Sequence, residues 1–235
     1  YGDTVEEIDW SVGEILAALK RHGLDERTLV VFTSDNGGSA QPGAGSNGAL
    51  RGFKGQTYEG GMREPFVARW PGRIPAGTVR GGVATTMDLF PTLVRLAGGE
   101  PPADRPFDGV DMLPLLTGQG SAARDTLYYW SHNWDSEPRI VAVRDGRWKL
   151  HFADALDWPQ TSFEATELYD LHADPSERFD LAKARPETVE RLTAKARGFL
   201  EQFEFGALPA VHYPPGGPSR PPGGVKTRVQ RRAER

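Results

Sequence analysis

The spacing of apolar residues divides the first hundred positions into two helices and two short strands. Apolar side chains recur every three or four positions over 3–21, which predicts an amphipathic helix. A continuous apolar run at 29–32 predicts a strand covered on both faces of an α/β sheet, and PFVARW at 65–70 predicts a second short strand. A further helix is expected over 83–97, with Asp88 as a structural cap.

Beyond position 125 the pattern becomes typical of strands. Four β-favouring runs follow one another at 127–130, 140–144, 147–152 and 167–171. Asp145-Gly146 is expected to form a two-residue type I′ hairpin turn between the middle two runs. A helix is expected over 186–203. Four antiparallel strands and one helix predict a small α+β subdomain that follows the α/β part of the chain.

These patterns predict three regions. Residues 1–120 are expected to be part of an α/β domain, residues 121–205 the antiparallel-sheet subdomain, and residues 206–235 a disordered basic tail rich in proline and glycine. A net charge of −4 gives no general attraction to nucleic acid or membrane, so neither is expected as a partner. The absence of cysteine excludes disulfides, zinc thiolates and cysteine nucleophiles within this sequence.

The first candidate site follows the strand predicted at 29–32. Ligands of open α/β sheets bind beyond the carboxyl ends of strands, which is where Asp35 and Asn36 lie. A carboxylate and an amide carbonyl are hard oxygen ligands suited to Ca²⁺, or to Mg²⁺. Asp-Asn-Gly is equally ordinary turn chemistry, so the sequence leaves an Asx-turn without metal as the alternative.

A glycine-rich loop then carries a single lysine, Lys54. Glycines allow the backbone to approach a ligand closely, and a lysine among them can provide a point charge for an oxyanion. The alternative for Lys54 is a solvated loop lysine. His132 stands between Trp130 and Trp134 and is a candidate substrate-binding residue, with a surface histidine as its alternative.

Three motifs in a fixed order carry a family resemblance: FTSDNG, then LRGFKGQTYEGGMREPF, then LYDLHADPSERFDLA. Together they resemble the C-terminal part of a type I, formylglycine-dependent sulfatase of the arylsulfatase kind, within the alkaline-phosphatase-like superfamily. The resemblance covers residues 1 to about 205. It implies the fold of that superfamily, with an antiparallel C-terminal subdomain that helps to wall the substrate pocket.

The resemblance also implies a function. It implies calcium-dependent hydrolysis of a small-molecule or carbohydrate sulfate ester, in which Asp35 and Asn36 complete a Ca²⁺ site and Lys54 contacts the sulfate. A periplasmic or secreted location is implied in the same way. Formylglycine is expected from a cysteine in a C-x-P-S-R motif, which this sequence lacks; Pro218-Ser219-Arg220 imitates its end, but Gly216 stands in the cysteine position.

The upstream Asp-Asp pair of the family is absent as well. We therefore expect a missing N-terminal part of the same protein, and an inactive chain in its absence. The alternatives are a phosphodiesterase or phosphonate monoester hydrolase of the same superfamily, and an inactive calcium-binding remnant. A serine hydrolase using Ser34 is disfavoured because the G-x-S-x-G elbow is missing.

Overall fold

The computed structural model describes residues 1–41, 43, 45–104, 108–121, 124–131, 139–153 and 160–202. They form two compact units. The first comprises residues 1–54 and 58–125, and the second comprises residues 55–57 with the described residues from 126 onward. The predicted tail at 206–235 and the candidate pocket residue His132 lie outside the described residues.

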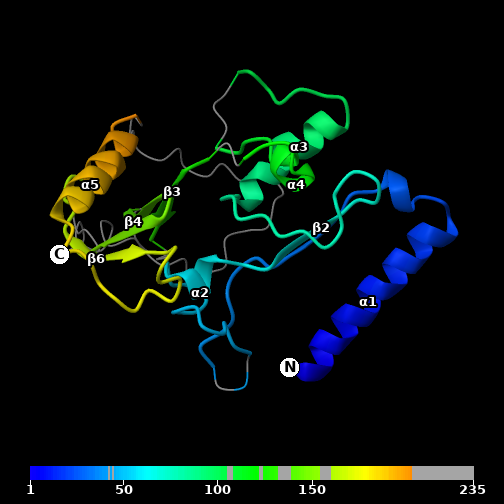
Figure 1. The fold of residues 1–235 in the computed structure, drawn as a ribbon, viewed down its shortest axis with the longest axis horizontal. Helices are drawn as coiled ribbons and strands as arrows, with labels where there is room; N and C mark the ends of the chain where they lie inside the picture. The colour runs from blue at the N-terminus through cyan, green and yellow to red at the C-terminus, as the bar shows by residue number, and fades with distance from the viewer. Residues whose placement is uncertain are drawn as a thin grey trace, which may run out of the picture. The chain divides into compact units, whose positions relative to one another are not determined.

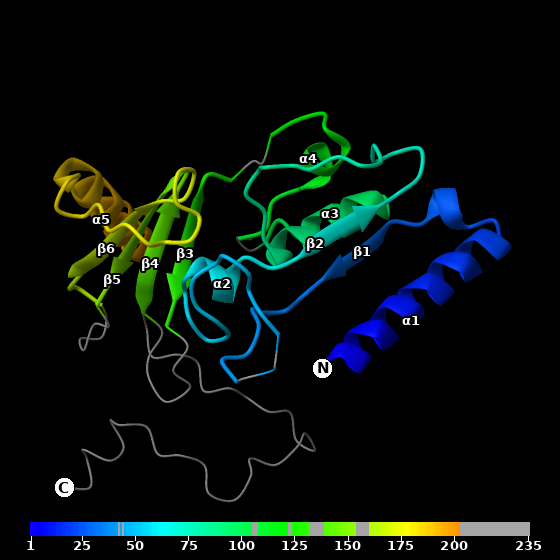
Figure 2. The same cartoon turned by 60° about the horizontal axis from the view of Figure 1, so that its bottom comes forward.

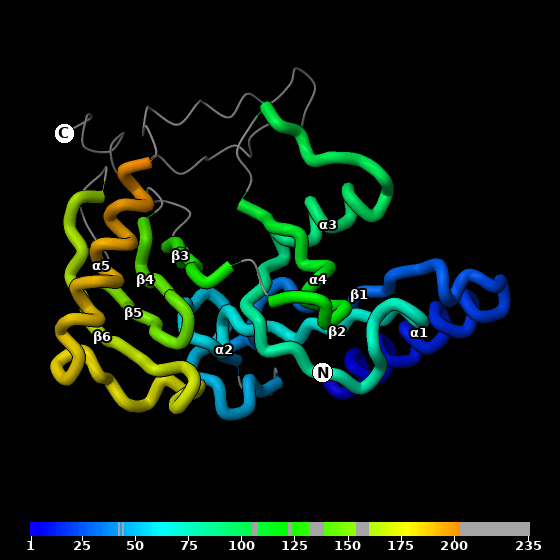
Figure 3. The backbone as a smooth tube through the Cα atoms, turned by 45° about the horizontal axis from the view of Figure 1, so that its top comes forward, coloured from blue at the N-terminus to red at the C-terminus, as the bar shows by residue number. Residues whose placement is uncertain are grey.

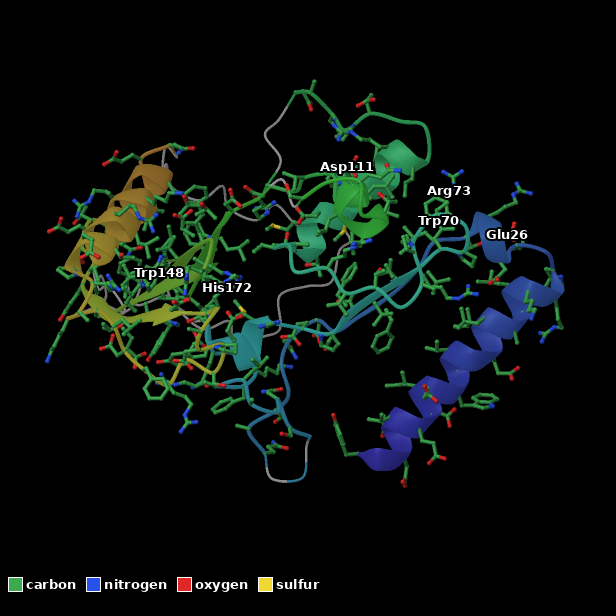
Figure 4. The ribbon with its side chains drawn as sticks, viewed as in Figure 1. Glu26, Trp70, Arg73, Asp111, Trp148 and His172 are labelled. Carbon is green, nitrogen blue, oxygen red and sulfur yellow. The ribbon has the colours of Figure 1, made fainter. Side chains whose placement is uncertain are left out.

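The first unit opens with α1 (Gly2–Arg21), a 3-10 turn η1 (Asp25–Arg27) and β1 (Val30–Thr33). A long loop containing the short helix α2 (Glu59–Met62) leads to β2 (Phe66–Arg69), which pairs antiparallel with β1 (Figure 1). The turn η1 is tied to the far end of β2. Asp25 accepts two hydrogen bonds from Arg69, at 2.7 and 3.0 Å, and the Trp70 indole donates to the Glu26 carbonyl at 2.9 Å (Figure 4).

The prediction of a strand covered on both faces is wrong for the described part of the chain. There β1 has β2 as its one neighbour, and the Phe32 side chain is 42% exposed. No residue of α1 is buried, and its apolar side chains Val5, Ile8 and Ile15 remain exposed. The described residues offer too little chain to cover these surfaces. None of the helices in those ranges has both the length and the apolar character that a bilayer span requires.

Asp88 organises the rest of the first unit, where η2 (Thr86–Asp88) leads into α3 (Leu89–Leu96) and α4 (Leu113–Thr117) follows (Figure 3). Its buried carboxylate accepts hydrogen bonds from the Thr85 and Val110 backbone N–H groups at 2.7 and 2.8 Å, and from Arg124 at 2.9 Å. The first of these bonds belongs to a capping box at the start of η2. The predicted structural role of Asp88 is therefore confirmed.

The second unit is a four-stranded antiparallel sheet covered on one face by a helix (Figure 2). The strands lie in sequence order, and the elements are β3 (Thr126–Trp130), β4 (Ile140–Asp145), β5 (Trp148–Phe152), β6 (Ala165–Asp170) and α5 (Pro186–Leu200). Val143, Leu150 and Leu168 from the sheet pack against Leu192 and Ala196 from α5, all fully buried. The predicted α+β arrangement is confirmed.

The turn between β4 and β5 lies one residue later than predicted. Asp145 pairs with Trp148 in the ladder, so the two turn residues are Gly146 and Arg147. Gly146 has φ +58°, whereas Arg147 has no positive φ. A type I′ turn requires positive φ at both positions, so the predicted turn type is wrong as well. Glycine takes the position that needs the left-handed backbone conformation.

The sheet face opposite α5 contains buried charges. Lys149 and Glu177 are both fully buried, with the Lys149 Nζ atom 3.0 Å from Glu177 Oε1, and His151 Nε2 lies 3.2 Å from the same oxygen. Glu177 has φ +52°, a backbone conformation that a non-glycine residue seldom adopts. Burial lowers the pKa of His151, with the hydrogen bond to Glu177 opposing that effect. These contacts attach the loop after β6 to the sheet.

Candidate cation and oxyanion site

The site begins where β1 ends, at Ser34, Asp35 and Asn36. The Ser34 hydroxyl donates to the Asn36 carbonyl at 3.0 Å, and the Asn36 side-chain N–H donates to the Gly37 carbonyl at 3.1 Å. Because the amide nitrogen is used in this way, Asn36 Oδ1 remains available as an acceptor. Among the described residues, neither that oxygen nor the Asp35 carboxylate has a hydrogen bond or ion pair with a side chain.

Asn47 ties the glycine-rich loop to this turn. Its Oδ1 accepts from the Gly38 backbone N–H at 2.9 Å, and its Nδ2 donates to the Gly52 carbonyl at 2.8 Å. The Lys54 backbone N–H donates in turn to the Gly38 carbonyl at 2.9 Å. Gly38 and Lys54, which are 16 residues apart along the chain, are thereby fixed together, so the lysine lies beside the turn that carries the Asp-Asn pair.

At Gly37 and Gly60 the backbone of the glycine-rich loop packs directly against other backbone segments. A Cβ atom at Gly37 would lie 1.9 Å from the Gly60 carbonyl oxygen, and one at Gly60 would lie 2.5 Å from the Gly52 oxygen. The Gly37 N–H donates to the Gly61 carbonyl at 3.3 Å, and the Gly60 N–H donates to the Arg51 backbone carbonyl at 2.7 Å. Gly37 and Gly60 are therefore required sterically, because no side chain fits between these segments.

The cationic side chains of the loop differ in their contacts. Arg51 donates to the Tyr58 hydroxyl at 3.0 Å, and its guanidinium lies 3.9 Å from the centre of that ring, so Arg51 has a structural task. The Lys54 side chain is exposed, and among the described residues no carboxylate pairs with it. Lys54 thus keeps its charge available to an anion from outside.

Glu64 is a residue that the sequence reasoning missed. Its Oε1 atom is buried and has no hydrogen-bond partner among the described residues. Burial chiefly, and then the negative charge of Asp35, raise the pKa of the Glu64 carboxyl above its usual range. The only sequence signal was its place in the REP end of the second motif, which gives no indication that the residue lies near Asp35.

The structure brings Asp35, Asn36 and Lys54 onto one connected backbone framework. The Asp35 carboxylate and Asn36 Oδ1 are hard oxygens without competing side-chain partners, and this donor set fits a divalent cation. In the described ranges no group of three or more acidic or histidine side chains is close enough to complete a metal shell, so these residues would supply part of one. The sequence has no cysteine, so this chain contains no cysteine precursor of formylglycine.

Comparison with known proteins places this geometry in a family. The sequence profile described as Sulfatase matches residues 1–99, and the profile described as N-sulphoglucosamine sulphohydrolase, C-terminal, matches residues 53–203. The two matches overlap at 53–99, which contains Lys54 and Glu64. The first therefore spans the whole candidate site, and the second spans the four-stranded sheet and α5.

Curated relatives agree with the profiles. The chain is 41% identical over 218 residues to an N-acetylgalactosamine-6-sulfatase of Canis lupus familiaris and 40% identical over 212 residues to an arylsulfatase A of Homo sapiens. Each match covers 82% of this chain and 41% of the relative, so the chain spans about two fifths of the length of these proteins.

The solved structures give the same result for the fold. The PsFucS1 sulfatase from Pseudoalteromonas sp. superimposes with a TM-score of 0.70 at 31% identity, over 85% of this chain and 42% of that structure. Sulfatases of this kind have the alkaline-phosphatase-like fold, to which the described elements correspond. The chain therefore belongs to the sulfatase family, and its residues correspond to the C-terminal part of a sulfatase.

Proposed function

We propose that this chain supplies part of the active site of a calcium-dependent sulfatase, in which Asp35 and Asn36 hold the cation and Lys54 faces the sulfate group. The observation that chiefly supports this proposal is the hydrogen bond from the Lys54 backbone N–H to the Gly38 carbonyl, which holds Lys54 beside the Asp35-Asn36 turn. Family membership supports the reaction class, since the relatives that match are named as sulfatases.

The chemistry assigned to these residues is electrostatic. The sulfate group carries negative charge that shifts between its oxygens during hydrolysis, and a preorganised cation near those oxygens stabilises the transition state. Lys54, with no carboxylate partner among the described residues, can meet that charge without first breaking an ion pair. A bound divalent cation would polarise the sulfate oxygens from the side of Asp35 and Asn36.

The remaining parts of the active site are assigned elsewhere. The nucleophile, expected to be a formylglycine, and the further carboxylate ligands would come from an N-terminal part of the same protein. We assign residues 1–120 to the catalytic domain and residues 121–205 to its C-terminal subdomain. The chain by itself is expected to bind the cation weakly and to lack hydrolytic activity.

The substrate is proposed to be a sulfate ester of a carbohydrate or of a small alcohol or phenol. The relatives include one named for N-acetylgalactosamine 6-sulfate and one named for aryl sulfates. His132 is proposed as a substrate contact. A location outside the cytoplasm, periplasmic or secreted, is proposed on the family resemblance.

The test uses the protein encoded by the complete reading frame that contains this sequence. Hydrolysis of p-nitrophenyl sulfate is compared with hydrolysis of bis-p-nitrophenyl phosphate, with and without calcium. We expect cleavage of the sulfate ester, and a loss of about 10²- to 10³-fold in kcat in Lys54→Ala without unfolding. Lys20→Ala, at the exposed end of α1, is the matched control. Preference for the phosphodiester, or full activity in Lys54→Ala, would contradict the proposal.

A further inference from the structure

If the antiparallel register of β1 and β2 is continued beyond its last pair, Glu64 comes opposite Asp35. The register pairs Thr33 with Phe66, and the Ser34 N–H donates to the Pro65 carbonyl at 3.4 Å, which extends the ladder by one step. One further step of the same register, beyond the ends of both strands, sets Asp35 against Glu64. Residues directly opposite one another in such a pair have Cβ atoms about 4.5–5.5 Å apart, so their side chains interact.

Two like charges in this position repel one another unless a counter-charge lies between or beside them. The Glu64 Oε1 atom is buried and has no hydrogen-bond donor among the described residues. A buried carboxylate oxygen without a partner is unfavourable, because it has lost its hydrogen bonds with water and no protein donor replaces them.

The described cationic residues do not neutralise this pair. Arg63 is adjacent to Glu64 in sequence and Lys54 is fixed near Asp35, yet neither forms an ion pair with either carboxylate in the described part of the chain. Arg51, the other basic residue of the loop, is bonded to Tyr58. Among the described residues the Asp35-Glu64 pair therefore has no cationic partner, which leaves its charge available to a metal cation.

We propose that Glu64 is a further acidic residue of the cation site, which balances the charge of a divalent cation held by Asp35 and Asn36. This inference rests on the cation site of the proposed function and adds a residue to it. The two strands then contribute together: β1 leads into Asp35 and Asn36, and β2 is preceded by Glu64. Within this chain, Asp35 and Glu64 together offer two negative charges to a doubly charged cation, whereas Asp35 alone offers one.

The experiment is a calcium titration of the 235-residue chain, followed by thermal unfolding and by terbium luminescence. Glu64→Gln keeps the shape of the side chain and removes its charge. Mutation of a residue that supports the ligands of a metal typically lowers metal affinity by about 10- to 100-fold, so we expect the calcium affinity of Glu64→Gln to fall by that factor. Glu6→Gln, an exposed position on α1, should bind calcium like the wild type.

A second readout separates this role from a structural one. In EDTA the Glu64→Gln chain should unfold at a higher temperature than the wild type, because the repulsion with Asp35 has been removed. In the double variant with Asp35→Asn this gain should disappear. Glu64→Asp, which keeps the charge, should retain most of the calcium affinity. A residue needed only for packing would instead lower the unfolding temperature in EDTA.

Two results would overturn the proposal. One is an unchanged calcium affinity in Glu64→Gln. The other is a wild-type chain that shows no response to calcium at about 10 mM, a concentration well above the dissociation constants of the weakest physiological calcium sites. The titration contains no sulfate ester, so it is independent of the reaction. If calcium binding follows the expectation while the complete protein fails to cleave sulfate esters, the proposed function fails and the role of Glu64 stands.

Discussion

The side chain of Asn47 forms a hydrogen bond with the backbone of Gly38, nine residues earlier, at 2.9 Å, and through its other atom holds Gly52 at 2.8 Å. A single amide therefore connects the turn that carries Asp35 and Asn36 with the loop that presents Lys54. The geometry of the candidate site depends on this residue, although it contributes no charge of its own.

Replacing Asn47 with alanine should loosen the loop without altering the rest of the fold. Two hydrogen bonds are lost, at about 0.5–1.5 kcal/mol each, so we expect the free energy of unfolding of the first unit to fall by about 1–3 kcal/mol. Urea unfolding measures this loss, and hydrogen exchange at Gly38 and Lys54 should report local opening. Gln41→Ala, on the exposed part of the same loop, should leave both measurements unchanged.

Gly37→Ala should be more damaging than its small size suggests. The new methyl group would lie 1.9 Å from the Gly60 carbonyl oxygen, so backbone must move. Overpacking of this kind typically destabilises by about 1–3 kcal/mol, and calcium binding should weaken with it. The matched control is Gly13→Ala in α1, where nothing lies within 4 Å. There the substitution should stabilise the helix by about 0.5–1 kcal/mol, so equal effects at the two positions would contradict the packing argument.

Glu177→Gln should strongly destabilise the second unit. The substitution removes the negative charge that Lys149 and His151 share, so the fully buried Lys149 ammonium loses its ion pair with Glu177. Breaking a buried ion pair on one side commonly costs about 3–5 kcal/mol. Urea unfolding followed by tryptophan fluorescence measures it. Glu187→Gln, an exposed carboxylate 4.0 Å from Arg185, should change the unfolding free energy very little.

The stability of the second unit should depend on pH through His151. Burial lowers its pKa in the folded chain below the ordinary value of 6.5, so between those two values the unfolded chain binds more protons. The contribution of His151 to the free energy of unfolding is therefore fully present above pH 6.5, and it is lost as the pH drops toward the pKa of the folded chain. The charged groups that act on the ring are Lys149, Glu177 and Glu167.

The control for this pH dependence is a variant without the imidazole. In His151→Gln the slope of the unfolding free energy with pH just below pH 6.5 should flatten. A separate loss is expected below pH 3.8, where Asp170, whose pKa is lowered chiefly by its hydrogen bond with Arg147, becomes protonated. That acid loss should persist in His151→Gln. An unchanged slope just below pH 6.5 would show that His151 is not responsible.

The sequence predicted the second unit well because local signals and tertiary structure agree there. The β-favouring runs at 140–144 and 147–152 correspond to β4 and β5, and Pro186 begins α5 where helix rules expect it. The turn was misplaced because Asp-Gly was expected at its centre, while the ladder continues through Asp145 to pair with Trp148.

The site could be predicted only in part. Asp35, Asn36 and Lys54 were found from the strand end, the glycine-rich loop and the family resemblance, and their proposed roles still await the tests above. Asn47 and Glu64 could not be found in this way, because their importance arises when the loop closes and when β2 pairs with β1. Polar residues in loops are common, and nothing local distinguishes one that bridges two segments from one in solvent.

Phe32 and Val67 form a cross-strand pair and are exposed at 42% and 59%. This exposed apolar pair favours self-association of the chain in solution. In the described residues β1 and β2 each have one neighbour, so each offers an open edge next to apolar side chains. Open edges of this kind recruit other chains. Light scattering by the isolated chain should therefore rise with its concentration, and Val67→Lys should suppress that rise, so a solubilising change at this position is the practical first step toward purification.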